Sequence, residues 1–114
     1  MRTIIAGSRT FADADLLAKT MAALPWTPTV VLSGGARGAD RLGEQWARRH
    51  SIPVEVYPAD WNTYGRSAGY RRNEVMAGLA DALVAFWDGT SPGTKHMLDI
   101  ARSHGLRYHL VTPS

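Results

Sequence analysis

Arginines and glycines gather in four short segments of the chain, and together these residue types favour binding of a phosphate group. The segments are residues 7–10, 33–38, 58–69 and 88–94, and they hold eight of the eleven glycines. Five arginines lie in them or just after them: Arg9, Arg37, Arg66, Arg71 and Arg72. Glycine lets backbone N–H groups approach a ligand closely, and a guanidinium donates paired hydrogen bonds to phosphate oxygens. The pattern therefore predicts a site for an anionic ligand.

The same segments supply the individual residues that we expect to contact this ligand. They are Gly7, Ser8, Arg9, Gly34, Gly35, Ala36, Arg37, Gly38, Asp40, Arg66, Arg72, Asn73, Asp88, Gly89, Ser91, Gly93 and Thr94. Ser8, Asp40 and Thr94 also have a simpler interpretation, because such residues commonly cap helices. The chain contains neither G-x-G-x-x-G nor G-x-x-x-x-G-K-[ST], which argues against a dinucleotide dehydrogenase and a P-loop nucleotidase.

Two aromatic residues interrupt the polar segment 58–69. Trp61 and Tyr64 could stack on a nucleobase, or they could anchor the segment to the core. The four histidines are scattered without metal-ligand spacing, so we expect no metal site. Mg²⁺ carried in by a phosphate ligand is the one cofactor that the sequence leaves open.

Composition limits the class of protein. The 114 residues suit a single domain, 1–114, and 45% of them are hydrophobic. The absence of cysteine excludes disulfides, thiolate metal sites and a cysteine nucleophile. No apolar run is long enough to cross a bilayer, and residues 1–24 lack the layout of a signal peptide. We therefore expect a cytoplasmic protein without a membrane partner.

Alternating apolar runs and helical patterns indicate the elements that must position these side chains. Strands are predicted at residues 3–6, 29–32, 54–57, 82–87 and 108–111, and helices at 13–24, 39–50, 70–80 and 93–104. Glu55 places the third strand near an edge, whereas the wholly apolar fourth strand should be central. In the third helix Val75, Met76 and Leu79 are expected to face inward, and residues 58–70 to form a long polar connection.

This order of elements is typical of an α/β fold: a Rossmann-like, doubly wound, mainly parallel five-stranded sheet with helices on both faces. All four glycine-rich segments follow strands. In such folds ligands bind at the carboxyl ends of the strands, so the four segments should meet along one rim of the sheet.

Four ordered motifs resemble a known family. They are Gly7-Ser8-Arg9; Ser33 to Asp40; Pro58 to Trp61 with Tyr64 to Asn73; and Asp81 to Thr94. The chain resembles the YspA-like, YpsA-related branch of the SLOG superfamily, the DUF2493 group, which is common in bacteria and their phages. The resemblance implies a Rossmann-like fold that binds nucleotides or their derivatives. The superfamily also includes sensor domains, the LOG enzymes, and the DNA-processing protein A group, which binds single-stranded DNA.

The LOG enzymes cleave the N-glycosidic bond of nucleoside monophosphates, and their motif matches this chain only in part. Arg72 and Met76 fit the catalytic arginine and the methionine four residues later, and Gly93-Thr94 fits the glycine-rich loop. The catalytic glutamate position, however, falls on Met97. Hydrolysis through an oxocarbenium-like transition state needs a carboxylate, which methionine cannot supply.

Three functions follow from the sequence and the resemblance. The first is binding of a nucleotide or nucleotide-derived phosphate ligand by a sensor or processing domain. The second is an N-glycosidase or phosphoribohydrolase, with Arg72, Glu74 and Asp88 as candidate catalytic residues and Asp40 as another carboxylate that could substitute. The third is binding of single-stranded DNA, although a net charge of +3 is modest for that role. A second copy of the chain could complete the site or the core surface.

Overall fold

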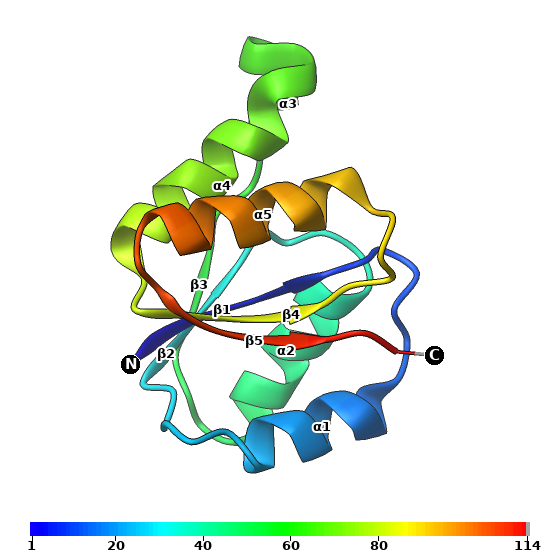
Figure 1. The fold of residues 1–114 in the computed structure, drawn as a ribbon, viewed down its shortest axis with the longest axis vertical. Helices are drawn as coiled ribbons and strands as arrows, with labels where there is room; N and C mark the ends of the chain where they lie inside the picture. The colour runs from blue at the N-terminus through cyan, green and yellow to red at the C-terminus, as the bar shows by residue number, and fades with distance from the viewer. Residues whose placement is uncertain (114) are drawn as a thin grey trace.

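The computed structural model of this chain describes residues 1–113 and is built around one parallel sheet (Figure 1). Its strands are β1 (Arg2–Gly7), β2 (Val30–Ser33), β3 (Val54–Val56), β4 (Ala82–Phe86) and β5 (Arg107–Val111). They pair in the order β3-β2-β1-β4-β5, and every pairing is parallel. The expected Rossmann-like α/β class is confirmed, with β3 at an edge and β4 in the interior.

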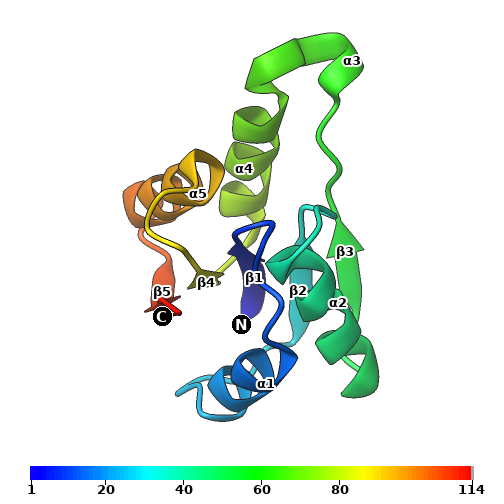
Figure 2. The ribbon, with the colours of Figure 1, turned by 90° about the vertical axis from the view of Figure 1, so that its right-hand side faces the viewer.

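Helices cover both faces of the sheet (Figure 2). The helices α1 (Ala14–Ala22) and α2 (Ala39–Arg49) lie on one face, and α4 (Ala68–Leu79) and α5 (Pro92–Ser103) lie on the other. A hydrophobic core lies on each face of the sheet. Strand β4 contributes to both cores, because successive side chains of a strand point to opposite faces. Leu83 and Ala85 belong to the core beneath α4 and α5, while Val84 and Phe86 belong to the core beneath α1 and α2.

Helix α4 buries a different face from the one that the sequence predicts. Met76 faces inward as expected, at 2% exposure, but Val75 is 52% exposed and Leu79 is 45% exposed. The buried residues of α4 include Asn73 and Ala77 instead. The helix therefore turns its buried stripe toward α5 and leaves the opposite flank open, so the prediction for Val75 and Leu79 was wrong.

Residues 58–70 are more ordered than the expected polar connection. They contain the short helix α3 (Trp61–Tyr64), the 3₁₀ turn η1 (Gly65–Ser67) and the first turn of α4. Asp60 caps α3, because its side chain accepts a hydrogen bond from the Thr63 N–H at 3.1 Å. We call residues 61–67 the α3 arm; it stands beyond the first turn of α4, at the top of Figure 1.

Within residues 1–113, no helix has both the length and the apolar character needed to span a membrane.

Candidate functional site

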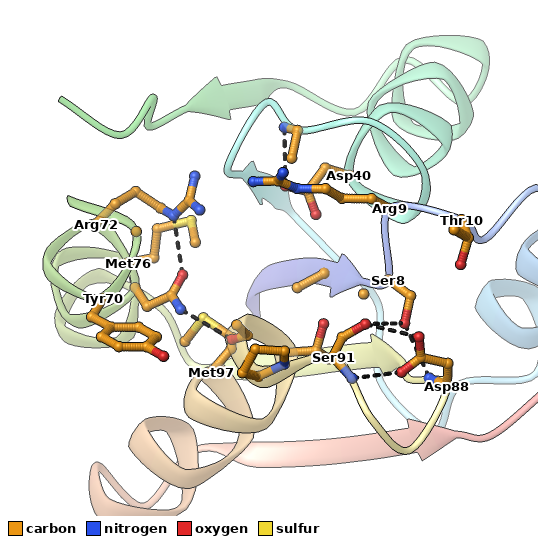
Figure 3. Close-up of a pocket in the computed structure, with 18 of the residues that line it drawn as sticks. Ser8, Arg9, Thr10, Asp40, Tyr70, Arg72, Met76, Asp88, Ser91 and Met97 are labelled. Carbon is orange, nitrogen blue, oxygen red and sulfur yellow. Dashed lines mark hydrogen bonds between the residues drawn. The ribbon is translucent and has the colours of Figure 1, made fainter. Parts of the chain in front are cut away.

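A cavity of about 470 Å³ opens at the carboxyl edge of the sheet (Figure 3). It is lined by the end of β1, by the loops after β1, β2 and β4, by the start of α2, by residues of α4 and α5, and by the α3 arm. The lining residues are Ala6, Gly7, Ser8, Arg9, Thr10, Ala36, Asp40, Trp61, Arg66, Gly69, Tyr70, Arg72, Asn73, Met76, Asp88, Ser91, Pro92, Gly93, Thr94 and Met97. Residues as far apart in sequence as Ala6 and Met97 thus share one concave surface.

Most of the predicted ligand-contact and catalytic residues lie on this surface, and six do not. The six outside the lining are Gly34, Gly35, Arg37, Gly38, Glu74 and Gly89. Gly35 and Gly38 have positive φ angles of 74° and 78° and shape the turn after β2. Arg37 and Glu74 are exposed to solvent away from the cavity, as is Gly89 at the tip of its loop.

One end of the cavity is held by a polar network between the loops after β1 and β4. The Asp88 N–H donates to Ser8 Oγ at 3.0 Å, and the hydroxyls of Ser8 and Ser91 lie 3.2 Å apart. The Asp88 carboxylate in turn accepts hydrogen bonds from the N–H groups of Thr90 and Ser91 and from Ser91 Oγ. The network fixes the loop that leads into α5.

These hydrogen bonds also decide the charge of Asp88. Donation from the N–H groups of Ser91 and Thr90 holds the pKa of Asp88 well below its usual range. A carboxylate that stays ionised and is tied by three donors is suited to ordering a loop. It is poorly suited to taking a proton near neutral pH.

Arg72 crosses from α4 to the opposite wall of the cavity. Its Nη1 donates to the carbonyl oxygen of Gly34 at 2.8 Å and to that of Tyr57 at 3.4 Å. Its Nε donates to Asn73 Oδ1 at 3.0 Å. Burial lowers the pKa of Arg72, and the charge of Asp40 opposes that change. The guanidinium is thus anchored to the ends of β2 and β3 and held at the cavity wall.

Asn73 connects Arg72 to the start of α5. Its Nδ2 donates to the carbonyl oxygen of Gly93 at 3.3 Å and lies 3.2 Å from His96 Nδ1. Because Asn73 is only 6% exposed, these bonds replace contacts with water. A buried asparagine in the inward stripe of a helix therefore has a positioning role here.

Asp40 is the second buried carboxylate of the site, at 6% exposure. Its Oδ2 accepts a hydrogen bond from the Ala36 N–H at 3.2 Å, whereas Oδ1 accepts none from residues 1–113. Burial raises the pKa of Asp40 from 3.8 to about 6, and the Ala36 N–H and the charges of Arg72 and Arg9 limit the rise. A carboxyl group that titrates near neutral pH inside a cavity is able to exchange a proton.

Gly34 explains how Arg72 and Asp40 come together. A Cβ atom at this position would overlap Arg72 Nη1 and would lie 2.8 Å from Asp40 Oδ2. Both side chains occupy the space that any larger residue would need. Gly34 does not line the cavity, but it is required for the arrangement of two residues that do.

Two methionines, Met76 and Met97, form part of the cavity floor, at 2% and 1% exposure. Met97 stands where the LOG motif has its glutamate, so that position does reach the cavity in this fold but carries an apolar side chain. The carboxylates that do reach the lining are Asp40 and Asp88.

The aromatic side of the cavity was only partly anticipated. The sequence predicts that Trp61 either stacks on a nucleobase or anchors its segment to the core, and the LOG motif marks Met76 and Met97. Four further lining residues are not predicted as ligand contacts: Thr10, Gly69, Tyr70 and Pro92. Their sequence signal was weak, because none of them carries a charge. Within residues 1–113, no group of three or more histidine and carboxylate side chains is placed to hold a metal ion.

Comparisons with known proteins support the sequence resemblance. The model of the YspA, cpYpsA-related SLOG family matches residues 1–64. The gene 61 protein of Mycobacterium phage D29 is 36% identical over 115 residues, covering 92% of this chain and 91% of that protein. The X-ray structure of DNA processing protein A from Streptococcus pneumoniae has a TM-score of 0.79 at 16% identity. That similarity covers 99% of this chain and 50% of the other, so the chain spans half of that protein and shares its fold.

Proposed function

The chain belongs to the YspA, cpYpsA-related SLOG family, and from that premise we propose that it binds a nucleotide or nucleotide-derived phosphate ligand in the cavity at the carboxyl edge of the sheet. The observation that carries the proposal is the convergence of Arg9, Arg66 and Arg72 on one cavity that also receives the first turn of α5. Together these groups supply positive potential and hydrogen-bond donors to a single ligand.

Ser8, Arg9 and the start of α5 form the phosphate end of the proposed site. The first N–H groups of a helix have no partner inside the helix, and Gly93 and Thr94 occupy that position in α5. Arg9 makes no hydrogen bond or ion pair within residues 1–113, so its guanidinium is free to bind a ligand. The Ser8–Asp88–Ser91 network fixes the loop before α5 and uses neither the Arg9 guanidinium nor the N–H groups of Gly93 and Thr94.

A titration tests this proposal directly. Native mass spectrometry of freshly purified protein should detect a bound nucleotide, and calorimetry with AMP, CMP and NAD should give saturable binding. Arg9→Ala should weaken the tightest of these by about tenfold or more, the usual loss for a charge-assisted hydrogen bond. Arg49→Ala is the control, because Arg49 is exposed at the far end of α2. Absence of a co-purified nucleotide and of binding by all three compounds would refute the proposal.

A second candidate function is hydrolysis of a nucleoside 5′-monophosphate, and Asp40 is the observation that favours it. In this reaction the oxygen of water bonds to C1′ of the ribose while the bond from C1′ to the base nitrogen breaks. Asp40 would accept one proton of the attacking water and then release it to solvent, and the departing base nitrogen would take up a proton from solvent. Arg72, on the same wall, would hold the ribose, with the phosphate at the Ser8 and Arg9 end.

Chromatography of AMP or CMP incubated with the protein separates the two functions. Release of free base that Asp40→Asn abolishes would establish the hydrolase. Intact nucleotide after prolonged incubation, together with saturable binding, would leave the binding function alone.

A further inference from the structure

Trp61 differs from the other tryptophans of the chain. Trp26, Trp46 and Trp87 are half-buried and pack against the two hydrophobic cores. Trp61 is 51% exposed, belongs to an arm helix with no buried residue, and lines the cavity. An indole held on a concave wall outside the core has a face available to another aromatic ring.

The backbone of α4 supports this indole from one side. A Cβ atom built on Gly69 would lie 3.4 Å from Trp61 Cη2 and 3.9 Å from Cζ2, so the ring rests over a residue without a side chain. Tyr70, the next residue, is 44% exposed and also lines the cavity. Its ring packs on His96, with centroids 4.3 Å apart.

Tyr64, the other aromatic residue of the arm, packs against an arginine side chain. The guanidinium of Arg71 lies 4.4 Å from the centre of its ring, and Arg71 Nε donates to Ser67 Oγ at 3.1 Å. Tyr64 does not line the cavity. The arm thus presents Trp61 to the site and uses Tyr64 for its own stability.

The aromatic wall formed by Trp61 and Tyr70 lies at the opposite end of the cavity from the Ser8–Asp88–Ser91 network. Figure 3 shows Tyr70 beside Arg72 on one side, and Ser8 with Asp88 on the other. A ligand that filled this space would place an anionic group near Ser8 and Arg9 and an aromatic group near Trp61 and Tyr70.

We infer that Trp61 and Tyr70 form a nucleobase subsite in which the indole stacks on the base, so that the ligand is a nucleoside 5′-phosphate and not a sugar phosphate alone. This inference rests on the proposed function and adds the part of the ligand that determines specificity. Stacking on an aromatic side chain is available to every base, so the subsite selects for the presence of a base more than for its identity.

Calorimetric titration of the full chain with AMP and with ribose 5-phosphate tests the inference. Wild-type protein should bind AMP about tenfold tighter or more, in line with the usual strength of base–aromatic stacking. Trp61→Ala should remove most of that preference by weakening AMP binding alone. Trp61→Phe should retain it, and Tyr108→Ala should change neither affinity, because Tyr108 is an exposed residue of β5 outside the cavity lining. Circular dichroism should show that each variant is folded.

Each outcome has a defined meaning. If neither AMP nor ribose 5-phosphate binds, the proposed function itself fails. If both bind with equal affinity, or if Trp61→Ala weakens both equally, the site stands but the nucleobase subsite is refuted. If a ten-residue oligothymidylate binds more tightly than AMP, the aromatic wall serves single-stranded DNA and the inference is overturned.

Discussion

Arg72 and Asp40 show how single residues determine the chemistry of this cavity. Each is charged in its ordinary state, each is largely removed from water, and both end close to Gly34. Removing charges from water is costly unless they are paired or hydrogen-bonded. Arg72 satisfies that requirement with two carbonyl oxygens and Asn73, whereas Asp40 accepts one hydrogen bond from residues 1–113. The unequal bonding leaves Asp40 as the residue whose charge is more easily changed.

Asp40→Asn should alter how stability depends on pH. The folded carboxyl group keeps its proton up to about pH 6, whereas the unfolded chain releases it near 3.8, so the contribution of Asp40 to stability is present below pH 3.8 and is lost as the pH rises through 6. The stability of Asp40→Asn relative to wild type should therefore increase by up to about 3 kcal/mol between pH 4 and pH 7.5. Urea denaturation at a series of pH values measures this difference. A difference that is constant over the range would contradict the assigned pKa.

Sequence reasoning was able to identify the types of these residues but not all of their positions. Asp40 opens α2, whereas Arg72 and Asn73 lie in the N-terminal half of α4, and these locations brought all three to the cavity. Glu74, only one residue beyond Asn73, is exposed outside the lining because each residue of a helix turns by about 100°. The choice between neighbouring helical residues depends on how α4 is rotated, which its neighbour α5 decides.

At the scale of elements, the α3 arm is the part that a sequence pattern could not predict. Four residues are too few to show a helical period, and no residue of α3 is buried, so no apolar stripe marks it. The order of the arm comes from local contacts instead. These are the Asp60 cap, the Tyr64–Arg71 stack and the hydrogen bond from Ser67 Oγ to the Tyr64 carbonyl oxygen.

Asp60→Ala should loosen the α3 arm without unfolding the domain. The substitution removes the acceptor for the Thr63 N–H, and the arm contributes no residue to either hydrophobic core. We expect weaker AMP binding, by about fivefold, with a nearly unchanged melting temperature, since loss of one cap costs about 1 kcal/mol. Calorimetry and thermal denaturation measure the two effects. Asp60→Asn keeps an acceptor oxygen and should behave like wild type. If Asp60→Ala binds AMP with unaltered affinity, the cap of α3 has no influence on the binding site.

At the scale of the whole molecule, the fold was the most predictable property. Alternation of short apolar runs with helical patterns indicated a parallel sheet, and Glu55 marked β3 as an edge strand, both of which are confirmed. The family resemblance read from four motifs is confirmed as well. The shape of the cavity could not be predicted from the sequence, because it depends on how five strands and four long helices pack around the residues of the four motifs.

Ligand binding should stabilise the whole domain, because the cavity joins segments that separate on unfolding. At AMP concentrations one hundred times the dissociation constant, binding adds about 2.7 kcal/mol to the free energy of unfolding. For a domain of this size the melting temperature should then rise by roughly 10 °C or more. Differential scanning calorimetry of wild type and Arg9→Ala at the same AMP concentration measures the effect. An equal rise in both proteins would show that AMP stabilises the fold from somewhere other than this cavity.

The position of the α3 arm has a kinetic consequence. Trp61 reaches the cavity from a segment that is joined to β3 through residues 57–60 and to α4 through its first turn, and that contains Gly65, whose φ angle is 56°. Outward tilting of this segment would uncover the aromatic wall while every strand pairing stays intact. The residence time of a bound molecule would then be governed by a local displacement far faster than global unfolding, and the protein could respond quickly to a falling ligand concentration.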